Sequence, residues 1–325
     1  MIPKFTDVLA ARQRIIPYLS PTPTHRYQPI DDLIGTAVYI KHENYQPVGA
    51  FKIRGGINLV SQLSDDERKR GLIGASTGNH GQSIARAGQL FGVAVKIVVP
   101  QGANLGKVAA MRGFGAEVIF HGENFDDAVH HVEELTAEFG YRYVHSGNEP
   151  HLIAGVGTET LELLEAAPNL DVLYVPIGGG SGAAGTCIVA KTVNPNIRVV
   201  GVQSTASPAA YESWRSGQIE IRPNKSIAEG LATGHGFELP QEILQKYLDD
   251  FVLVSDESIL QAMVWMLERA HTLAEAAGAS PLAAMYQARN QLQGKTVGMI
   301  CSGGNTSLTQ LKQAIDFSLQ KSREV

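Results

Sequence analysis

The feature that most constrains the fold is an alternation between short β-branched runs and longer stretches with helical patterning. The runs read as strands at 37–43, 72–77, 93–100, 116–122, 171–178, 197–204, 251–258 and 296–304, and helical stretches include 104–114, 125–139 and 153–166. Apolar strands separated by helices are typical of parallel sheets covered on both faces. The sequence therefore predicts an α/β, doubly wound fold, with its least regular stretch, 208–240, as an excursion over the site.

Charge and composition exclude several classes of partner. The 325 residues are 44% hydrophobic, and 27 basic against 32 acidic residues give a net charge of -5. That balance gives no electrostatic reason to bind nucleic acid or an anionic membrane. The two cysteines, Cys187 and Cys301, are far apart in apolar surroundings, which fits a reducing compartment. We therefore expect a cytoplasmic protein that binds neither nucleic acid nor membranes.

Three glycine-rich segments follow predicted strands and open predicted helices: "ASTGNHG" at 75–81, "PIGGGSGAAG" at 176–185 and "CSGGNTS" at 301–307. Ligands of open α/β folds bind at such places, and helix N-termini favour anions. The segment 178–182 suits a phosphate, although a tight turn that needs glycine for packing is the alternative. It is neither a P-loop, since no Lys-Ser/Thr follows, nor a dinucleotide fingerprint, since the next strand ends in Gln203 and Ser204.

Lys52 lies in "VGAFKIRGG", between apolar residues and glycines. Burial disfavours the ammonium form, and a neutral amine can form a Schiff base with an aldehyde. The alternative is a lysine that lies along a helix face with its ammonium in water. An aldehyde and a phosphate occur together in pyridoxal 5'-phosphate, so Lys52 and the 178–182 loop together indicate this cofactor.

Two further segments supply short polar side chains. Ser302, at the end of a strand, can donate a hydrogen bond to a ring nitrogen, and Ser76 and Asn79, at a helix start, suit a carboxylate. Helix capping is the alternative for each of them.

Four motifs, "ENYQPVGAFKIRGG", "STGNHGQSIA", "PIGGGSG" and "CSGGN", in this order, resemble fold-type II pyridoxal-phosphate enzymes. Within these, the chain is most similar to the serine/threonine dehydratases (threonine ammonia-lyases) and serine racemases, over nearly its whole length. The resemblance implies two doubly wound α/β domains, as in tryptophan synthase beta, with the cofactor between them. By position, the large domain comprises 1–70 and 147–325, and the small inserted domain 71–146. A homodimer or higher homo-oligomer is also implied.

The resemblance further implies roles for single residues. Lys52 would be the catalytic Schiff-base lysine and the base at Cα, and Phe51 would flank the cofactor ring. Asn79 would meet the ring hydroxyl, and Ser302 would face the pyridine nitrogen. The substrate carboxylate would be bound by Ser76, Thr77, Asn79 and His80, and the cofactor phosphate by Gly178, Gly179, Gly180, Ser181 and Gly182.

The implied reaction is β-elimination, in which a 3-hydroxy L-amino acid such as threonine or serine gives a 2-oxo acid and ammonia. A serine opposite the ring nitrogen favours expulsion of a β leaving group over a long-lived carbanion. Little sequence follows "CSGGN". We therefore expect no C-terminal regulatory domain, no feedback by isoleucine and a catabolic role.

The chain departs from the family pattern at several positions. Val48 and Ala50 stand in the lysine motif where hydroxyl residues are usual, and Thr77 stands where racemases use a serine as second base. Gln203 replaces an acidic ligand, so we expect no metal site. Racemase or β-replacement synthase activity stays open, as does a nucleotide-binding regulator in which Lys52 is structural.

Overall fold

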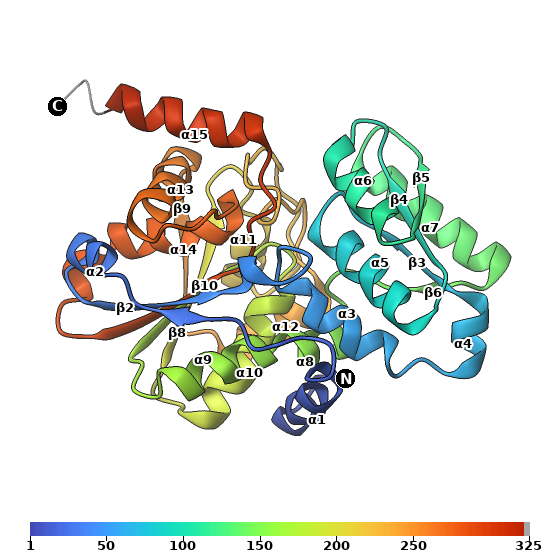
Figure 1. The fold of residues 1–325 in the computed structure, drawn as a ribbon, viewed down its shortest axis with the longest axis horizontal. Helices are drawn as coiled ribbons and strands as arrows, with labels where there is room; N and C mark the ends of the chain where they lie inside the picture. The colour runs from blue at the N-terminus through green and yellow to red at the C-terminus, as the bar shows by residue number, and fades with distance from the viewer. Residues whose placement is uncertain (322–325) are drawn as a thin grey trace.

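The structure, a computed structural model, describes residues 1–321 and contains two separate, mainly parallel sheets (Figure 1). The six-stranded sheet has the order β1-β2-β10-β7-β8-β9, in which only the β1–β2 pair is antiparallel. Its strands are β1 (Thr24–His25), β2 (Ala37–His42), β7 (Val172–Pro176), β8 (Arg198–Ser204), β9 (Asp250–Val254) and β10 (Thr296–Cys301).

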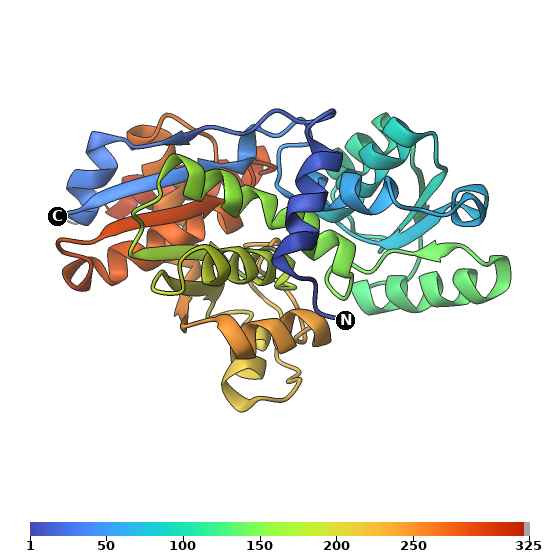
Figure 2. The same cartoon turned by 90° about the horizontal axis from the view of Figure 1, so that it is seen from below.

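The four-stranded sheet is parallel, with the order β5-β4-β3-β6. Its strands are β3 (Leu72–Ala75), β4 (Val95–Val99), β5 (Glu117–Phe120) and β6 (Arg142–Tyr143). Viewed from below, the part of the molecule built on this sheet lies beside the larger part (Figure 2). The α/β class and the two-sheet architecture predicted from the sequence are confirmed.

Most consecutive strands are joined by one or more helices, as the crossovers between parallel strands require. They are α1 (Phe5–Ile15), α2 (Gln28–Ile34), α3 (Lys52–Val60), α4 (Asp65–Arg70), α5 (Asn79–Phe91), α6 (Leu105–Gly113), α7 (Phe125–Phe139), α8 (Pro150–Val156), α9 (Thr158–Ala166), α10 (Ser181–Val193), α11 (Ala209–Ser216), α12 (Glu238–Tyr247), α13 (Asp256–Arg269), α14 (Ala276–Gln287) and α15 (Leu308–Lys321). Among residues 1–321, none of these helices is both long and apolar enough to cross a membrane.

One predicted helical stretch is two helices in the structure. The sequence predicts a single helical segment over 153–166, but α8 ends at Val156 and α9 begins at Thr158. The break lies at Gly157, where a Cβ would come within 3.3 Å of the Gly185 carbonyl oxygen on α10. The turn therefore lets α10 approach the chain more closely than a side chain would allow.

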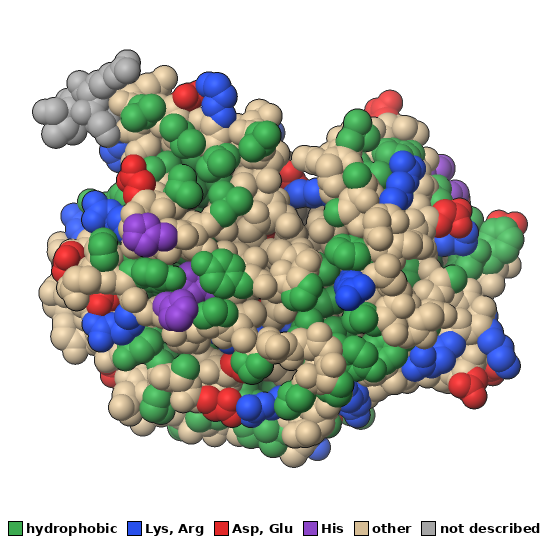
Figure 3. Space-filling model, viewed as in Figure 1, with side chains coloured by type: hydrophobic (Ala, Val, Ile, Leu, Met, Phe, Trp, Pro, Cys, Tyr) green, Lys and Arg blue, Asp and Glu red, His purple; other side chains and the backbone are tan. Residues whose placement is uncertain are grey.

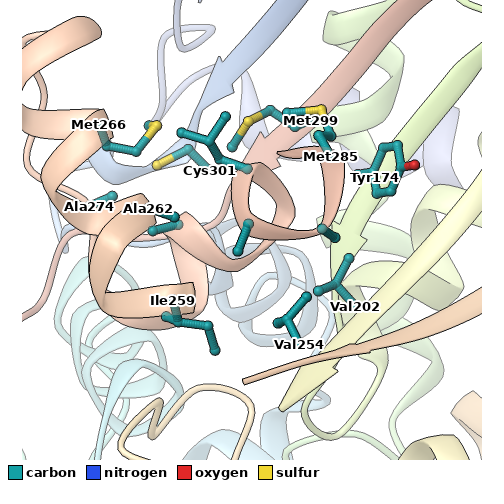
Figure 4. Close-up of a cluster of buried hydrophobic side chains, with 14 of the residues drawn as sticks. Tyr174, Val202, Val254, Ile259, Ala262, Met266, Ala274, Met285, Met299 and Cys301 are labelled. Atoms are coloured by element: carbon teal, nitrogen blue, oxygen red, sulfur yellow. The ribbon is translucent and has the colours of Figure 1, made fainter. Parts of the chain in front are cut away.

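Each sheet has its own apolar core. Val202, Val254, Met285 and Met299 belong to a buried cluster between the large sheet and α13 and α14 (Figure 4). On the small sheet, Ile84 and Ile97 share one cluster with Ile53 and Ile57 of α3 and with residues of α1. Helix α3 thus packs on α5 of the small-sheet part although it precedes residue 71, and the domain boundary at that residue stays a prediction.

The crossing of α3 and α8 is close because glycines face each other. A Cβ on Gly155 would lie 2.6 Å from the Arg54 carbonyl oxygen and 2.7 Å from Gly55 Cα. These are backbone atoms, which cannot move aside as a flexible side chain can. The crossing sets the position of α3 and therefore of Lys52, its first residue.

We expect Gly155→Ala to destabilise the protein by about 1–3 kcal/mol, because the added methyl group overpacks this crossing. Urea unfolding followed by circular dichroism measures the change. Gly113→Ala is the matched control: this glycine is also helical, but the space within 4 Å of the point where a methyl group would stand is open. There alanine should stabilise the helix by about 0.5–1 kcal/mol. Equal effects at both positions would contradict the close-crossing explanation.

Candidate active site

Lys52 begins α3 and directs its amine toward the glycine-rich loop that follows β7 in the large sheet. Its Nζ donates to Ser181 Oγ at 2.7 Å and to the Ser146 carbonyl oxygen at 3.1 Å. Burial lowers the pKa of Lys52 to about 8, because the ammonium form loses its hydration. A substantial fraction of the amine is therefore neutral in weakly alkaline solution, as nucleophilic attack requires.

The loop that ends β7 is tightly enclosed. A Cβ on Gly178 would collide with the Gly230 carbonyl oxygen, and one on Gly179 would collide with the Phe237 ring. Gly180 has a φ of +87°, in the left-handed region that favours glycine. Ser181 then begins α10, a buried helix of 13 residues. The loop so offers backbone N–H groups and a helix N-terminus, which suit an anion such as a phosphate.

The loop after β3 is folded around Ser76. Its Oγ accepts hydrogen bonds from the N–H groups of Gly78, at 3.2 Å, and Gly81, at 2.9 Å. His80 donates from Nε2 to the Val144 carbonyl oxygen at 3.1 Å. Burial, with a smaller effect of Lys52, lowers the pKa of His80 to about 3, so this ring is neutral. With His80 neutral, the positive partial charge in this loop comes from the N-terminus of α5.

Asn79 joins this loop to the end of β10. Its Nδ2 donates to Glu275 Oε1 at 2.7 Å, and its Oδ1 accepts from Asn305 Nδ2 at 2.8 Å. Both ends of the amide are engaged, which fixes its orientation. Burial raises the pKa of Glu275.

Ser302 is tied to the lysine segment through the backbone. Its carbonyl oxygen accepts from the Phe51 N–H at 3.0 Å, and Ala50 pairs with Gly303. Residues predicted from four distant segments of the sequence, around 52, 79, 181 and 302, are thus linked to one another in pairs. The structure shows these contacts; the roles given to the residues stay predictions.

The irregular stretch 208–240 contributes two contacts to the same region. Glu229 forms an ion pair with Lys107 of α6, and the Phe237 ring covers Gly179. The surface is hollowed between the two lobes of the molecule (Figure 3).

Sequence reasoning missed a buried ionic cluster next to Lys52. Arg54 binds both carboxylate oxygens of Glu43, at 2.7 and 2.8 Å, and both of Glu162, at 2.6 and 2.7 Å. Lys41 Nζ also donates to Glu162 at 2.6 Å. Arg54 and Glu43 are almost fully buried. No periodicity or motif marks such residues as partners, because their contacts span up to 121 positions of the chain.

A third carboxyl, Glu159, lies in the same buried region, and within residues 1–321 its Oε2 has no hydrogen-bond partner. Lys41 and Arg54 form ion pairs with Glu43 and Glu162, and among the described residues Glu159 has no ion pair. Burial and the charge of Glu43 raise the pKa of Glu159 well above its usual value. The pKa of Glu43 is instead lowered, since Arg54 outweighs the effect of burial. Of these two carboxyls, Glu159 is therefore the one whose charged form the fold disfavours.

We expect Glu159→Gln to raise the free energy of unfolding at pH 8 by about 1–3 kcal/mol, because it removes a carboxyl whose charged form burial disfavours in the folded state. The pKa is raised in the folded state. The wild type therefore loses stability as pH rises above the unfolded value, about 4.3. The gain should shrink toward zero below that pH. Urea titrations between pH 4 and 8 measure this.

Glu43→Gln is the control for that measurement. It removes a carboxylate that Arg54 grips at both oxygens, so we expect a loss of about 3–5 kcal/mol. A loss of similar size for Glu159→Gln would show that Glu159 is ionised and paired.

Comparisons with known proteins agree with this geometry. Residues 15–303 match the family model described as "Pyridoxal-phosphate dependent enzyme". The chain is 39% identical to the L-threonine ammonia-lyase of Thermotoga maritima, over 90% of this chain and 73% of that protein. It is 38% identical to the L-threo-3-hydroxyaspartate ammonia-lyase of Saccharomyces cerevisiae, over 95% of both. The crystal structure of serine racemase from Dictyostelium discoideum superposes with a TM-score of 0.88 at 34% identity, over 94% of this chain and 99% of that one.

Proposed function

We propose, from the finding that this chain belongs to the family of pyridoxal-phosphate dependent enzymes, that it catalyses β-elimination of a 3-hydroxy L-amino acid. Threonine or serine would give a 2-oxo acid and ammonia. One observation carries the proposal: the amine of Lys52, with its lowered pKa, lies 2.7 Å from the hydroxyl that begins α10. Relatives over most of the chain are named ammonia-lyases.

The residues present fit the cofactor. Pyridoxal phosphate needs a nucleophilic amine and an anion site within the length of one small molecule, and Lys52 and the 178–182 loop meet that condition. Gly230 and Phe237 leave no room for a side chain at Gly178 or Gly179. The backbone N–H groups of the loop would therefore be the groups that bind the phosphate. When bound, the cofactor withdraws electrons from the substrate Cα and so acidifies its proton.

The chain's own groups would then divide the remaining work. The neutral amine of Lys52 would take the proton from Cα, and Ser76, Thr77, Asn79 and His80 at the start of α5 would bind the carboxylate. Ser302 would donate a hydrogen bond to the ring nitrogen. A serine hydroxyl donates without giving up its proton, so it favours release of the β-hydroxyl over charge storage at Cα.

Several finer statements belong to the same proposal. We propose a catabolic role, serine as a second substrate, and assembly into a homodimer or larger homo-oligomer. A cytoplasmic location is supported by Cys187 and Cys301, which are buried and unbonded.

The direct test is release of a 2-oxo acid from the cofactor-loaded protein with L-threonine or L-serine. We expect release with the wild type and a loss of at least about 1000-fold in Lys52→Ala, because this variant lacks both the attachment point and the base. Lys96→Ala, which removes a partly exposed lysine paired with Glu117 in the small sheet, is the control and should keep the cofactor band and the activity. An unchanged rate in Lys52→Ala would refute the assignment.

Reconstitution of the cofactor-free protein tests the state of the amine. Only neutral Lys52 attacks the aldehyde, so the rate of appearance of the visible cofactor band should rise about tenfold per pH unit below 8. The rate should then level off above the lowered pKa of about 8. Stopped-flow absorbance between pH 6.5 and 10 measures it. A rate still rising at pH 10 would indicate an ordinary, hydrated lysine.

A further inference from the structure

A cavity of about 90 Å³ lies between the small-sheet part of the molecule and residues 235–237. Three of its walls adjoin the candidate site. Ala75 directly precedes the Ser76–His80 loop, the Ser146 carbonyl accepts from Lys52 Nζ, and Phe237 covers Gly179 of the phosphate loop. A substrate whose carboxylate binds the Ser76–His80 loop and whose Cα lies beside Lys52 still needs a space for its side chain. This cavity adjoins both the loop and Lys52.

The remaining walls are mostly apolar. Phe125 and Val129 come from α7 and Tyr143 from β6, while the Phe237 ring meets those of His145 and His235 at centroid distances of 4.8 and 5.2 Å. Among the described residues that line the cavity there is no lysine or arginine. The one acidic side chain, Asp126, is exposed at α7. A second carboxylate on a substrate would therefore meet a negative charge and find no fixed positive charge.

His145 does not supply a positive charge either. Its Nδ1 accepts hydrogen bonds from the N–H groups of Gly147, at 3.0 Å, and Asn148, at 2.9 Å. A nitrogen that accepts cannot carry a proton, so the ring is neutral with its proton on Nε2. Burial, followed by the charges of His235 and Lys52, lowers the pKa of His145 to about 4. Lys107, the cation above Gly78, is engaged by Glu229.

We infer, resting on the function proposed above, that this cavity binds the substituent on the substrate's Cβ and selects a short aliphatic group over a carboxylate. Its size sets the upper limit. A cavity of about 150 Å³ holds a benzene ring, so about 90 Å³ accommodates an isopropyl group better than a phenyl ring. The methyl group of threonine leaves part of it unfilled. The preferred substrates are thus 3-hydroxy L-amino acids with two to four carbons beyond Cβ, roughly as the volume allows.

The test compares kcat/KM for L-threonine, L-3-hydroxyleucine and L-threo-3-hydroxyaspartate at pH 8.5, where imidazole groups in general are uncharged. We expect 3-hydroxyleucine to exceed threonine by about tenfold, since two more carbons are buried. We expect 3-hydroxyaspartate to fall at least about tenfold below threonine. Equal values for all three would overturn the inference.

Two variants locate the selectivity in this cavity. Val129→Phe fills it, and the preference for 3-hydroxyleucine over threonine should fall about tenfold. Asp126→Lys replaces the negative charge by a positive one at an exposed position, and the ratio of 3-hydroxyaspartate to threonine should rise at least about tenfold. His130→Phe is the matched control, because His130 lies on the same helix but points to solvent, with 74% of its side chain exposed. Ratios that move equally in the control would contradict the assignment.

Equilibrium binding separates this inference from the proposed reaction. L-Leucine and L-aspartate carry the two kinds of side chain but no β-hydroxyl, and calorimetry on the loaded enzyme gives their dissociation constants without turnover. Tighter binding of L-leucine, weakened in Val129→Phe, supports the cavity even if no oxo acid is formed from any hydroxy acid. Release of oxo acid from threonine, with L-aspartate bound as tightly as L-leucine, would leave the reaction standing and remove the selectivity.

Discussion

A buried ionic interaction holds the start of α3, and with it Lys52, against two other parts of the chain: Arg54 pairs with both Glu43 and Glu162. Glu43 follows β2, Arg54 lies two residues after Lys52 in α3, and Glu162 lies in α9. The planar guanidinium group of Arg54 binds one carboxylate on each side through two hydrogen bonds. Such paired bonds fix both the distance between the two side chains and their relative orientation. The segment after β2, helix α3 and the distant helix α9 are thereby held together within one helical turn of Lys52. The cluster is costly to bury, and the hydrogen bonds that satisfy it offset this cost.

Topology then brings the other site groups to the amine. In the large parallel sheet β7 and β10 end at the same edge, so the loops after them can face a common ligand. The loop after β3, in the small sheet, meets the segment after β10 through the hydrogen bond between Asn79 and Asn305. The loop after β7 needs glycine because a side chain would collide with its neighbours: at Gly178 with the backbone of Gly230, and at Gly179 with the ring of Phe237. The ion pair between Lys107 and Glu229 adds a tie between the small-sheet part and the irregular stretch of the large part. Its neighbours Gly78 and Gly230 belong to the loops of the site.

Local patterns are enough to predict most of the fold and the anchors of the site. All eight predicted strands occur, because each is a β-branched run with a turn signal behind it. The two-residue strands β1 and β6 escape prediction, since two residues show no periodicity. Residue type and spacing point to Lys52 and the glycine loops. Their contacts with each other, such as Lys52 with Ser181, confirm that they meet.

The features that sequence reasoning missed are long-range. The break at Gly157 lies where Gly185 of α10 comes close, and Arg54 pairs with Glu162, 108 positions away. The raised pKa of Glu159 follows from its burial and from the charge of Glu43, which folding brings close to it. The side-chain cavity needs residues from α7, β6 and the stretch before α12 at once. Periodicity describes neighbours along the chain, so it carries no information on such meetings.

The central claim is that Lys52 is the residue that holds the cofactor. The most direct measurement is reduction of the loaded protein with borohydride, followed by digestion and mass spectrometry to locate the pyridoxyl label. We predict that the label lies on the peptide that contains Lys52, at one label per chain. A label on Lys41 or Lys107, or on no single lysine, would contradict it.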